Sequence, residues 1–139
     1  MEKRLYQREK LDNVDAVFYI QGIKDGNNEF SGIATDISDR GLAIRVSDEK
    51  QIEIADQTNI GTVLRFVFVD EYDFFEEEKT VQVEGVAKIV RKEKVSGELQ
   101  FGCEIPGRIE MIEQYVSDKV IVSFINEEIK QDNYILKKE

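Results

Sequence analysis

The sequence contains no histidine and only one cysteine, Cys103, among its 139 residues. Without histidine the chain cannot form a Ser-His-Asp or Cys-His catalytic group, and a single cysteine leaves no ligand set for zinc and no internal disulfide. The GxxxxGK[ST] and GxGxxG patterns, whose glycines hold phosphates in the common nucleotide-binding folds, are also missing. We therefore expect a protein that is not an enzyme and that carries no metal and no other cofactor. The alternative is a catalytic pair among the many carboxylates, but their spacing singles out no pair and is typical of solvated surface charge.

Long apolar runs are absent as well. A membrane-spanning helix needs roughly eighteen or more apolar residues, whereas the best candidate, residues 63–69, is short and is interrupted by Arg65. The N-terminus Met1-Glu2-Lys3-Arg4 leads into polar residues and not into an apolar signal core. We expect a cytoplasmic protein without membrane insertion, which agrees with the single cysteine.

Negative charge dominates the chain, with a formal net charge of −10 and a pI near 4.6. This field repels a polyanion, so a general role in coating DNA or RNA is disfavoured. The first ten residues nevertheless have a surplus of two positive charges, from Lys3, Arg4, Arg8 and Lys10 against Glu2 and Glu9. A basic arm on an acidic body suits a small anion better than a polymeric nucleic acid.

Six segments show the two-residue periodicity of half-buried strands: residues 14–21, 30–37, 42–47, 63–69, 81–90 and 99–105. Turn signals separate several of them, notably Asp25-Gly26-Asn27-Asn28 and Lys94-Val95-Ser96-Gly97. Six strands joined by turns indicate a mainly β fold, an antiparallel barrel or sandwich. The segment Asp70–Lys79, with six acidic residues, is interpreted as a protruding loop; a partner-docking tip and a calcium site are the alternatives.

After Pro106 and Gly107 the periodicity becomes helical. Residues 108–130 are predicted to form one amphipathic helix, whose apolar stripe is Ile109, Ile112, Val116, Val120, Phe124 and Ile129. The β-branched run at residues 120–122 weakens the middle of this prediction. We expect the stripe to close one end of the barrel, with partner binding as the alternative, and residues 131–139 to form a tail.

Two motifs have the chemistry for a guanine nucleotide. The first is the arginine pair Arg4 and Arg8 in the basic arm, and the second is the turn Asp36-Ile37-Ser38-Asp39-Arg40-Gly41. Arginine grips phosphate oxygens or the O6 and N7 atoms of guanine in a bidentate manner and stacks on bases. The Asp36 carboxylate and the Ser38 hydroxyl can accept from guanine N1 and N2, and Gly41 allows close approach of a ligand.

These motifs differ in specificity. By chance an RxxxR pair is expected roughly 0.35 times in this composition, but a DxSxxG match only about 0.04 times. The alternatives are a solvated terminus for Arg4 and Arg8, and simple turn capping for Asp36 and Ser38. An EF-hand is rejected, because Arg40 and Ser47 occupy its fifth and twelfth positions, where the loop needs an oxygen ligand and a glutamate.

At these residues the chain resembles the PilZ domain, a family of bacterial cyclic di-GMP receptors. The resemblance extends over residues 3–130 and includes the RxxxR pair, the DxSxxG turn, Ile60-Gly61-Thr62 and Phe101-Gly102-Cys103-Glu104-Ile105. It implies a six-stranded antiparallel β-barrel with an N-terminal basic arm and a C-terminal α-helix. Arg40 departs from the family pattern, which often has a small residue there; it either adds a cation or crowds the turn.

The resemblance also implies the division of the chain and its function. Residues 1–130 would be one PilZ-like domain, with a ligand-binding arm at 1–12, the barrel at 13–107 and the helix at 108–130. Arg4 and Arg8 would hold phosphates and guanine edges, Asp36 and Ser38 would contact a guanine, and Gly41 would shape the turn. Cyclic di-GMP would bind as one molecule or as an intercalated pair, which Lys3 favours, and would order the arm for a downstream protein partner. The alternatives are a PilZ-like interaction scaffold that binds no nucleotide and an unrelated small β-barrel, either an enzyme or a nucleic-acid binder.

Overall fold

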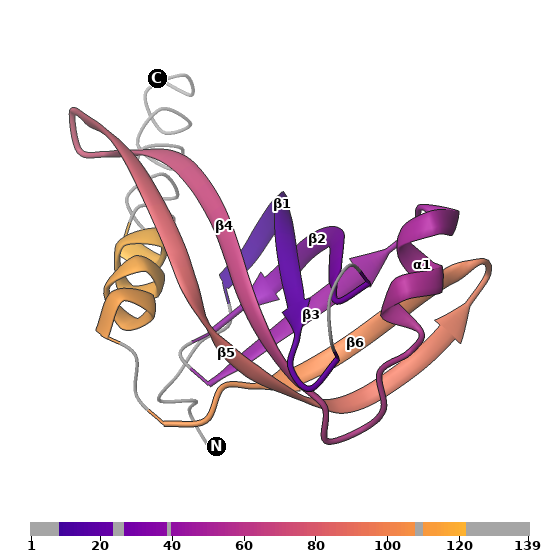
Figure 1. Cartoon of the computed structure of the whole chain (residues 1–139). Coiled ribbons are helices and arrows are strands. Elements are labelled where there is room, and N and C mark those ends of the chain that lie inside the picture. Colours follow the sequence, from indigo (N-terminus) through magenta and orange to yellow (C-terminus); the bar gives the residue numbers. More distant parts are fainter. Residues whose placement is uncertain (1–8, 24–26, 39, 108–109, 122–139) are drawn as a thin grey trace, which may run out of the picture.

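Figure 1 shows a computed structural model of the chain, which describes residues 9–23, 27–38, 40–107 and 110–121. Six strands dominate it: β1 (Glu9–Ile20), β2 (Glu29–Ile37), β3 (Gly41–Val46), β4 (Val63–Phe74), β5 (Glu77–Val95) and β6 (Glu98–Glu104). A short helix, α1 (Glu49–Ala55), follows β3, and a second helix occupies residues 110–121. Neither described helix is long and apolar enough to span a membrane.

All the strand pairs are antiparallel, and their order β1-β2-β3-β6-β5-β4 forms a closed barrel in which β4 returns to pair with β1. The expected mainly β fold with six antiparallel strands is thus confirmed. β1 begins at Glu9, four residues before the expected start of the barrel at residue 13. Its first residues pair with the end of β2, as Glu9↔Ile37 and Lys10↔Asp36.

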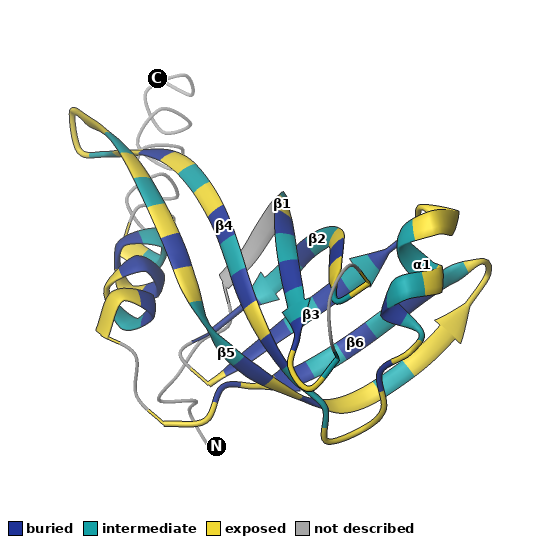
Figure 2. Ribbon diagram, in the orientation of Figure 1, coloured by how far each residue is buried: buried dark blue, intermediate teal, exposed yellow. Residues whose placement is uncertain are grey.

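The alternation in the sequence becomes the alternation of buried and exposed positions along each strand (Figure 2). Inward-facing aromatic rings fill the barrel: Phe30 stacks on Phe18 with centroids 5.2 Å apart and lies 6.1 Å from Phe101. Ile44 and Leu99 are buried beside them. Every second residue of a strand points to one face, so the opposite set is left on the outer surface, where a ligand has access.

Helix α1 was not predicted. Asp48 caps its N-terminus, where its carboxylate accepts hydrogen bonds from the amides of Lys50 at 2.9 Å and Gln51 at 3.2 Å. Ala55 is buried, and the half-buried Ile52 packs against the core. The helix is therefore held by its cap and by one apolar face, and not by length.

The prediction of a loop at Asp70–Lys79 is wrong. Both flanking strands continue through it and pair at Tyr72↔Lys79 and Phe74↔Glu77, which leaves only residues 75 and 76 as the turn. Because β4 pairs with β1 only as far as Phe68, β4 and β5 pair only with each other beyond this point in the described part of the chain. We call residues 69–82 the distal hairpin; it extends away from the barrel in Figure 1.

The helix at residues 110–121 lies along the distal hairpin (Figure 1). Ile112, Tyr115 and Val116 form its buried stripe, and the Tyr115 ring packs edge-on against Phe68 and Tyr72 at 5.7 and 6.0 Å. The stripe thus contains Ile112 and Val116, as predicted, and also Tyr115, which is not part of the predicted stripe. The rest of the predicted helix and the tail lie outside the described residues.

Candidate functional site

The turn between β2 and β3 is organised by Ser38. Its Oγ accepts hydrogen bonds from the amides of Arg40 at 3.2 Å and Gly41 at 3.0 Å, and its own amide donates to the Gly41 carbonyl at 2.9 Å. Only 5% of Ser38 is exposed. A hydroxyl has two acceptor positions and one proton, so the turn occupies both acceptor positions. Ser38 therefore caps the turn, and toward a ligand it has a proton to donate and no lone pair with which to accept.

Gly41 closes the turn at the start of β3. It begins β3, pairs with Glu104 of β6, and has both its amide and its carbonyl bonded to Ser38. The described glycines with positive φ are Gly22, Gly61, Gly97 and Gly107, and Gly41 is not among them. Gly41 is buried at the base of the turn, and its backbone is not in the left-handed region.

Asp36 lies at the end of β2, between two neighbouring strands. It pairs with Lys10 of β1 on one side and with Ala43 of β3 on the other. The register between β2 and β3 shifts between Ala34 and Asp36, so that Thr35 and Asp36 are both half-buried. A bulge of this kind redirects side chains at the edge of a site.

The two arginines of the basic arm, Arg4 and Arg8, lie outside the described residues. The backbone pairs Glu9↔Ile37 and Lys10↔Asp36 show where β1 begins, which is directly beside the end of β2 and next to the Ser38 turn. The two motifs are 28 positions apart between Arg8 and Asp36. The sheet nevertheless brings the strand that follows the first motif against the strand that carries the second.

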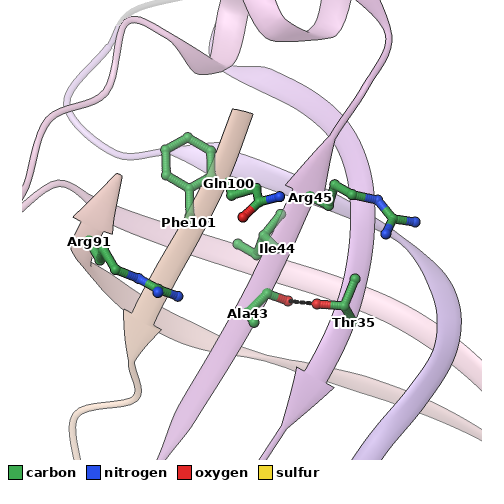
Figure 3. Close-up of a pocket in the computed structure, with 7 residues that line it drawn as sticks. All are labelled: Thr35, Ala43, Ile44, Arg45, Arg91, Gln100 and Phe101. Atoms are coloured by element: carbon green, nitrogen blue, oxygen red, sulfur yellow. Dashed lines mark hydrogen bonds between the residues drawn. The ribbon is translucent and has the colours of Figure 1, made fainter. Parts of the chain in front are cut away.

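A groove with a volume of about 160 Å³ lies on the outer face of β2, β3, β6 and β5 (Figure 3). Its lining comprises Thr35, Ala43, Ile44, Arg45, Arg91, Gln100 and Phe101. Gly102 of β6 pairs with Ala43 of β3 on one side and with Arg91 of β5 on the other. The two small residues Ala43 and Gly102 therefore lie between Arg91 and β2. The Arg91 side chain crosses this space, with Nε and Nη2 3.0 Å from where a Cβ of Gly102 would lie.

The second cation of the groove is Arg45. Its Nε lies 3.6 Å from Oε2 of Glu98, which also accepts a hydrogen bond from the Ser47 hydroxyl at 2.9 Å. The Nε atom is buried, and none of the described residues accepts a hydrogen bond from it. The charge of Arg45 is therefore balanced by the neighbouring Glu98 carboxylate.

Neither Arg45 nor Arg91 belongs to the site that the sequence motifs predict. The position of each arginine in its strand pattern indicates that its side chain faces outward. Arg45 lies between the buried Ile44 and Val46 of β3. Arg91 follows the buried Ile89 by two positions, and a register shift lies between them. Outward-facing cations on the strands beside a ligand motif were therefore the detectable feature.

Behind the groove, the Cys103 thiol lies inside the barrel. Burial raises the pKa of Cys103 to about 12, and the nearby charge of Arg91 only partly opposes this. The thiol is therefore protonated at neutral pH and is a poor nucleophile. Within the part of the chain that the structure describes, no group of three or more His, Cys, Asp or Glu side chains is arranged to hold a metal ion.

Comparison with known families assigns the chain. The sequence profile of the PilZ domain matches residues 2–118. The chain belongs to the PilZ domain family. PilZ domains are binding and regulatory domains, and all five residues predicted for the site, Arg4, Arg8, Asp36, Ser38 and Gly41, fall within the matched range.

One solved structure supports this fold. The Bacillus subtilis inhibitor of motility (MotI/DgrA) matches with a TM-score of 0.58 and 20% identity, over 87% of this chain and 53% of that one. This chain thus spans about half the length of that protein, and the likeness concerns the fold alone. The PilZ domain of CeSA from a cellulose-synthesizing bacterium matches with a TM-score of 0.40 and 18% identity, over 87% and 98% of the two chains. A search of curated protein sequences found no match.

Proposed function

We propose that this PilZ domain is a cytoplasmic, non-catalytic receptor for cyclic di-GMP, bound on the outer face of the barrel between the basic arm and the Ser38 turn. One observation carries the proposal. The start of β1 pairs with the end of β2, at Glu9↔Ile37 and Lys10↔Asp36, and Glu9 directly follows Arg8 in the sequence. A ligand that contacts both motifs would need this juxtaposition.

Each group in the proposed site has a matching partner on the nucleotide. Arg4 and Arg8 would bind phosphate oxygens or the O6 and N7 atoms of a guanine. The Asp36 carboxylate would accept from guanine N1 and N2, while Ser38, whose lone pairs are occupied by the turn, would donate its hydroxyl proton to a ligand oxygen. Arg91 would stack on a base or pair with a phosphate.

The size of the groove indicates how the ligand would be held. Pockets that enclose a drug-sized ligand typically have volumes of about 300–1,000 Å³. The groove, at about 160 Å³, has room for only part of a cyclic dinucleotide. The basic arm would cover the remainder, so that ligand binding would order the arm and change the surface offered to a protein partner.

Calorimetric titration of cyclic di-GMP into the purified protein tests this proposal. The wild type would be compared with the double variant Arg4→Ala/Arg8→Ala and with Arg65→Ala as a matched control. Arg65 is exposed on β4, where its guanidinium lies 4.3 Å from the centre of the Tyr19 ring and away from the groove lining. We expect saturable binding that is lost in the double variant, retained in the control and not seen with GTP.

The stoichiometry of the same titration separates one bound nucleotide from an intercalated pair. The pair carries four phosphates and would use the extra charge of Lys3. Absence of heat at high protein concentration, together with an unchanged melting temperature, would refute the receptor.

A second candidate function is a PilZ-like interaction scaffold that binds no nucleotide. The observation that favours it is the distal hairpin, which exposes Phe75 among acidic residues. The titration discriminates the two candidates, because the scaffold predicts no heat with cyclic di-GMP for the wild type.

A further inference from the structure

The distal hairpin, residues 69–82, has one covered face. On that face the Tyr72 hydroxyl donates to Oδ2 of Asp118 at 3.0 Å, and the Tyr115 hydroxyl donates to Oδ2 of Asp70 at 2.7 Å. Lys79 forms an ion pair with Asp118 at 3.3 Å. The helix at residues 110–121 therefore fixes the hairpin through side chains of the even-numbered positions of β4.

The opposite face of the distal hairpin is uncovered and acidic. Glu71 and Asp73 on β4, and Glu78 on β5, are exposed. Asp73 stands directly opposite Glu78 in the register, an arrangement in which like charges repel. The nearby cation Lys79 is engaged on the covered face, by Asp118 and by the Phe74 ring at 4.7 Å. Within the described residues, none of these three carboxylates takes part in an ion pair or a metal-binding group.

The tip of the hairpin presents an aromatic side chain to solvent. Phe75 is 68% exposed, and its φ of 59° lies in the left-handed region that a bulky residue rarely adopts. Two-residue hairpin turns favour glycine where φ is positive. Phe75 thus stands where glycine would fit the backbone better, and it buries little of its ring in return. Its ring contacts that of Phe74, with centroids 4.6 Å apart.

We propose that the tip of the distal hairpin is a docking site for a basic protein surface, in which Phe75 enters an apolar pocket and the acidic residues pair with lysine or arginine around it. An aromatic anchor with a charged rim is the arrangement typical of interface hot spots. The acidic charge identifies the partner, because it attracts a cationic surface. The same charge repels nucleic acid and anionic lipid, and the net charge of −10 disfavours a second copy of this chain.

Photo-crosslinking in the cells that produce the protein tests this site. A photoreactive phenylalanine analogue would replace Phe75 in the full-length protein and, as a matched control, Val95. Val95 is 41% exposed next to the turn between β5 and β6, a second hairpin of the same barrel. We expect a discrete crosslink at position 75 that is absent at position 95, to a protein whose contact peptide is rich in lysine or arginine. Equal labelling at the two positions, or crosslinks to an acidic peptide or to a second copy, would overturn the proposal.

The crosslinked protein would then be purified and titrated with variants. Phe75→Gly should weaken binding at least tenfold while the melting temperature stays the same or rises, because glycine suits the positive φ and little packing is lost. Glu78→Lys should slow association and flatten its salt dependence, whereas Glu93→Lys, exposed far along β5, should change neither.

Two results would contradict a docking role. Unchanged affinity in Phe75→Gly would show that the ring does not contact the partner. A markedly lower melting temperature in Phe75→Gly would show that Phe75 packs for stability. The cyclic di-GMP titration of Phe75→Gly should match the wild type, so that the outcome here does not depend on the receptor proposal.

Discussion

The same substitution, glycine to alanine, should have opposite consequences at two positions of the barrel. At Gly32 in β2, an added Cβ would lie 3.1 Å from the Arg45 carbonyl oxygen and 3.2 Å from a methyl group of Val46. These neighbours are backbone and buried core of β3, so they cannot move without disturbing the sheet. At Gly102 in β6, the added Cβ would meet Nε and Nη2 of Arg91 at 3.0 Å, and these atoms are the far end of a flexible side chain.

The magnitudes follow from two opposing effects. Overpacking a well-packed core costs about 1–3 kcal/mol, and replacing glycine restricts the unfolded chain, which contributes about 0.4–1 kcal/mol of stability. For Gly32→Ala the net result should be a loss of about 1–2 kcal/mol. For Gly102→Ala the Arg91 side chain rotates away, and stability should stay within about 0.5 kcal/mol of the wild type or increase slightly.

Urea denaturation followed by circular dichroism measures both variants. We expect a lower midpoint with an unchanged slope for Gly32→Ala, and a midpoint equal to or above the wild type for Gly102→Ala. Equal destabilisation by the two substitutions would refute the reasoning, because it would show that Arg91 is fixed as firmly as the β3 backbone.

The Gly102→Ala variant also tests the groove. If Arg91 contributes to nucleotide binding from its position across Gly102, its displacement should weaken cyclic di-GMP binding about tenfold, while the fold remains intact. Unchanged affinity would place the ligand outside the groove and leave the arm and the Ser38 turn as the whole site.

Three further outcomes follow from individual contacts. Ser38→Ala removes the hydroxyl that accepts hydrogen bonds from two backbone amides, so urea denaturation should show a loss of about 1–3 kcal/mol in the free energy of unfolding. Ser38→Thr retains a hydroxyl and should keep most of this stability. Burial and the neighbouring Asp118 raise the pKa of Tyr72 to about 12, so the phenol keeps its proton longer in the folded than in the unfolded chain. The stability that the Tyr72 phenol contributes should be fully present below about pH 10 and should decrease between about pH 10 and about pH 12. In Tyr72→Phe this decrease in the free energy of unfolding should be absent. Burial raises the pKa of Cys103 to about 12, so thiol reagents at pH 8 should label it slowly in the folded protein and rapidly in urea, and rapid native labelling would contradict its burial.

The strands could be predicted because one face of each is buried. Phe18, Phe30 and Phe101 alternate with more exposed residues, and this two-residue period is typical of a half-buried strand. The turn at Ser96 and Gly97 was likewise readable, and both residues have positive φ. The DxSxxG pattern predicts a tight turn. Only the structure shows that the Ser38 hydroxyl oxygen accepts two backbone hydrogen bonds within that turn.

The sequence does not identify the distal hairpin as paired strands, because its high charge density is typical of a loop although its periodicity is that of a strand. Asp70, Tyr72 and Phe74 recur at every second position, which is a strand pattern, but six acidic residues within Asp70–Lys79 are more typical of a loop. The helix at residues 110–121 covers this alternating set of side chains. The sequence of neither segment indicates that the hairpin and the helix pack against each other. Helix α1 was missed because its seven residues are too few to establish a helical period, although Asp48 is a recognisable cap.

The sequence does not show that Arg45 and Arg91 lie close together, because the pairing of β3, β6 and β5 brings them together. Arg45 and Arg91 are 46 positions apart, and they line the same groove only because β6 pairs with β3 on one side and with β5 on the other. A single sequence contains no signal for such pairing between distant strands. The pairing of the start of β1 with the end of β2 has the same origin.

β5 connects the two proposed sites and also separates them. It has Arg91 near one end, in the groove, and pairs Glu77 with Phe74 at the other, beside the docking tip. With a rise of about 3.3 Å per residue, roughly 45 Å of strand lies between these positions. Substitutions that far apart and without shared partners have additive effects on stability. A variant that combines Gly102→Ala with Phe75→Gly should therefore show the sum of the two separate changes in unfolding free energy, and a departure from this sum would be evidence that β5 couples the nucleotide site to the hairpin.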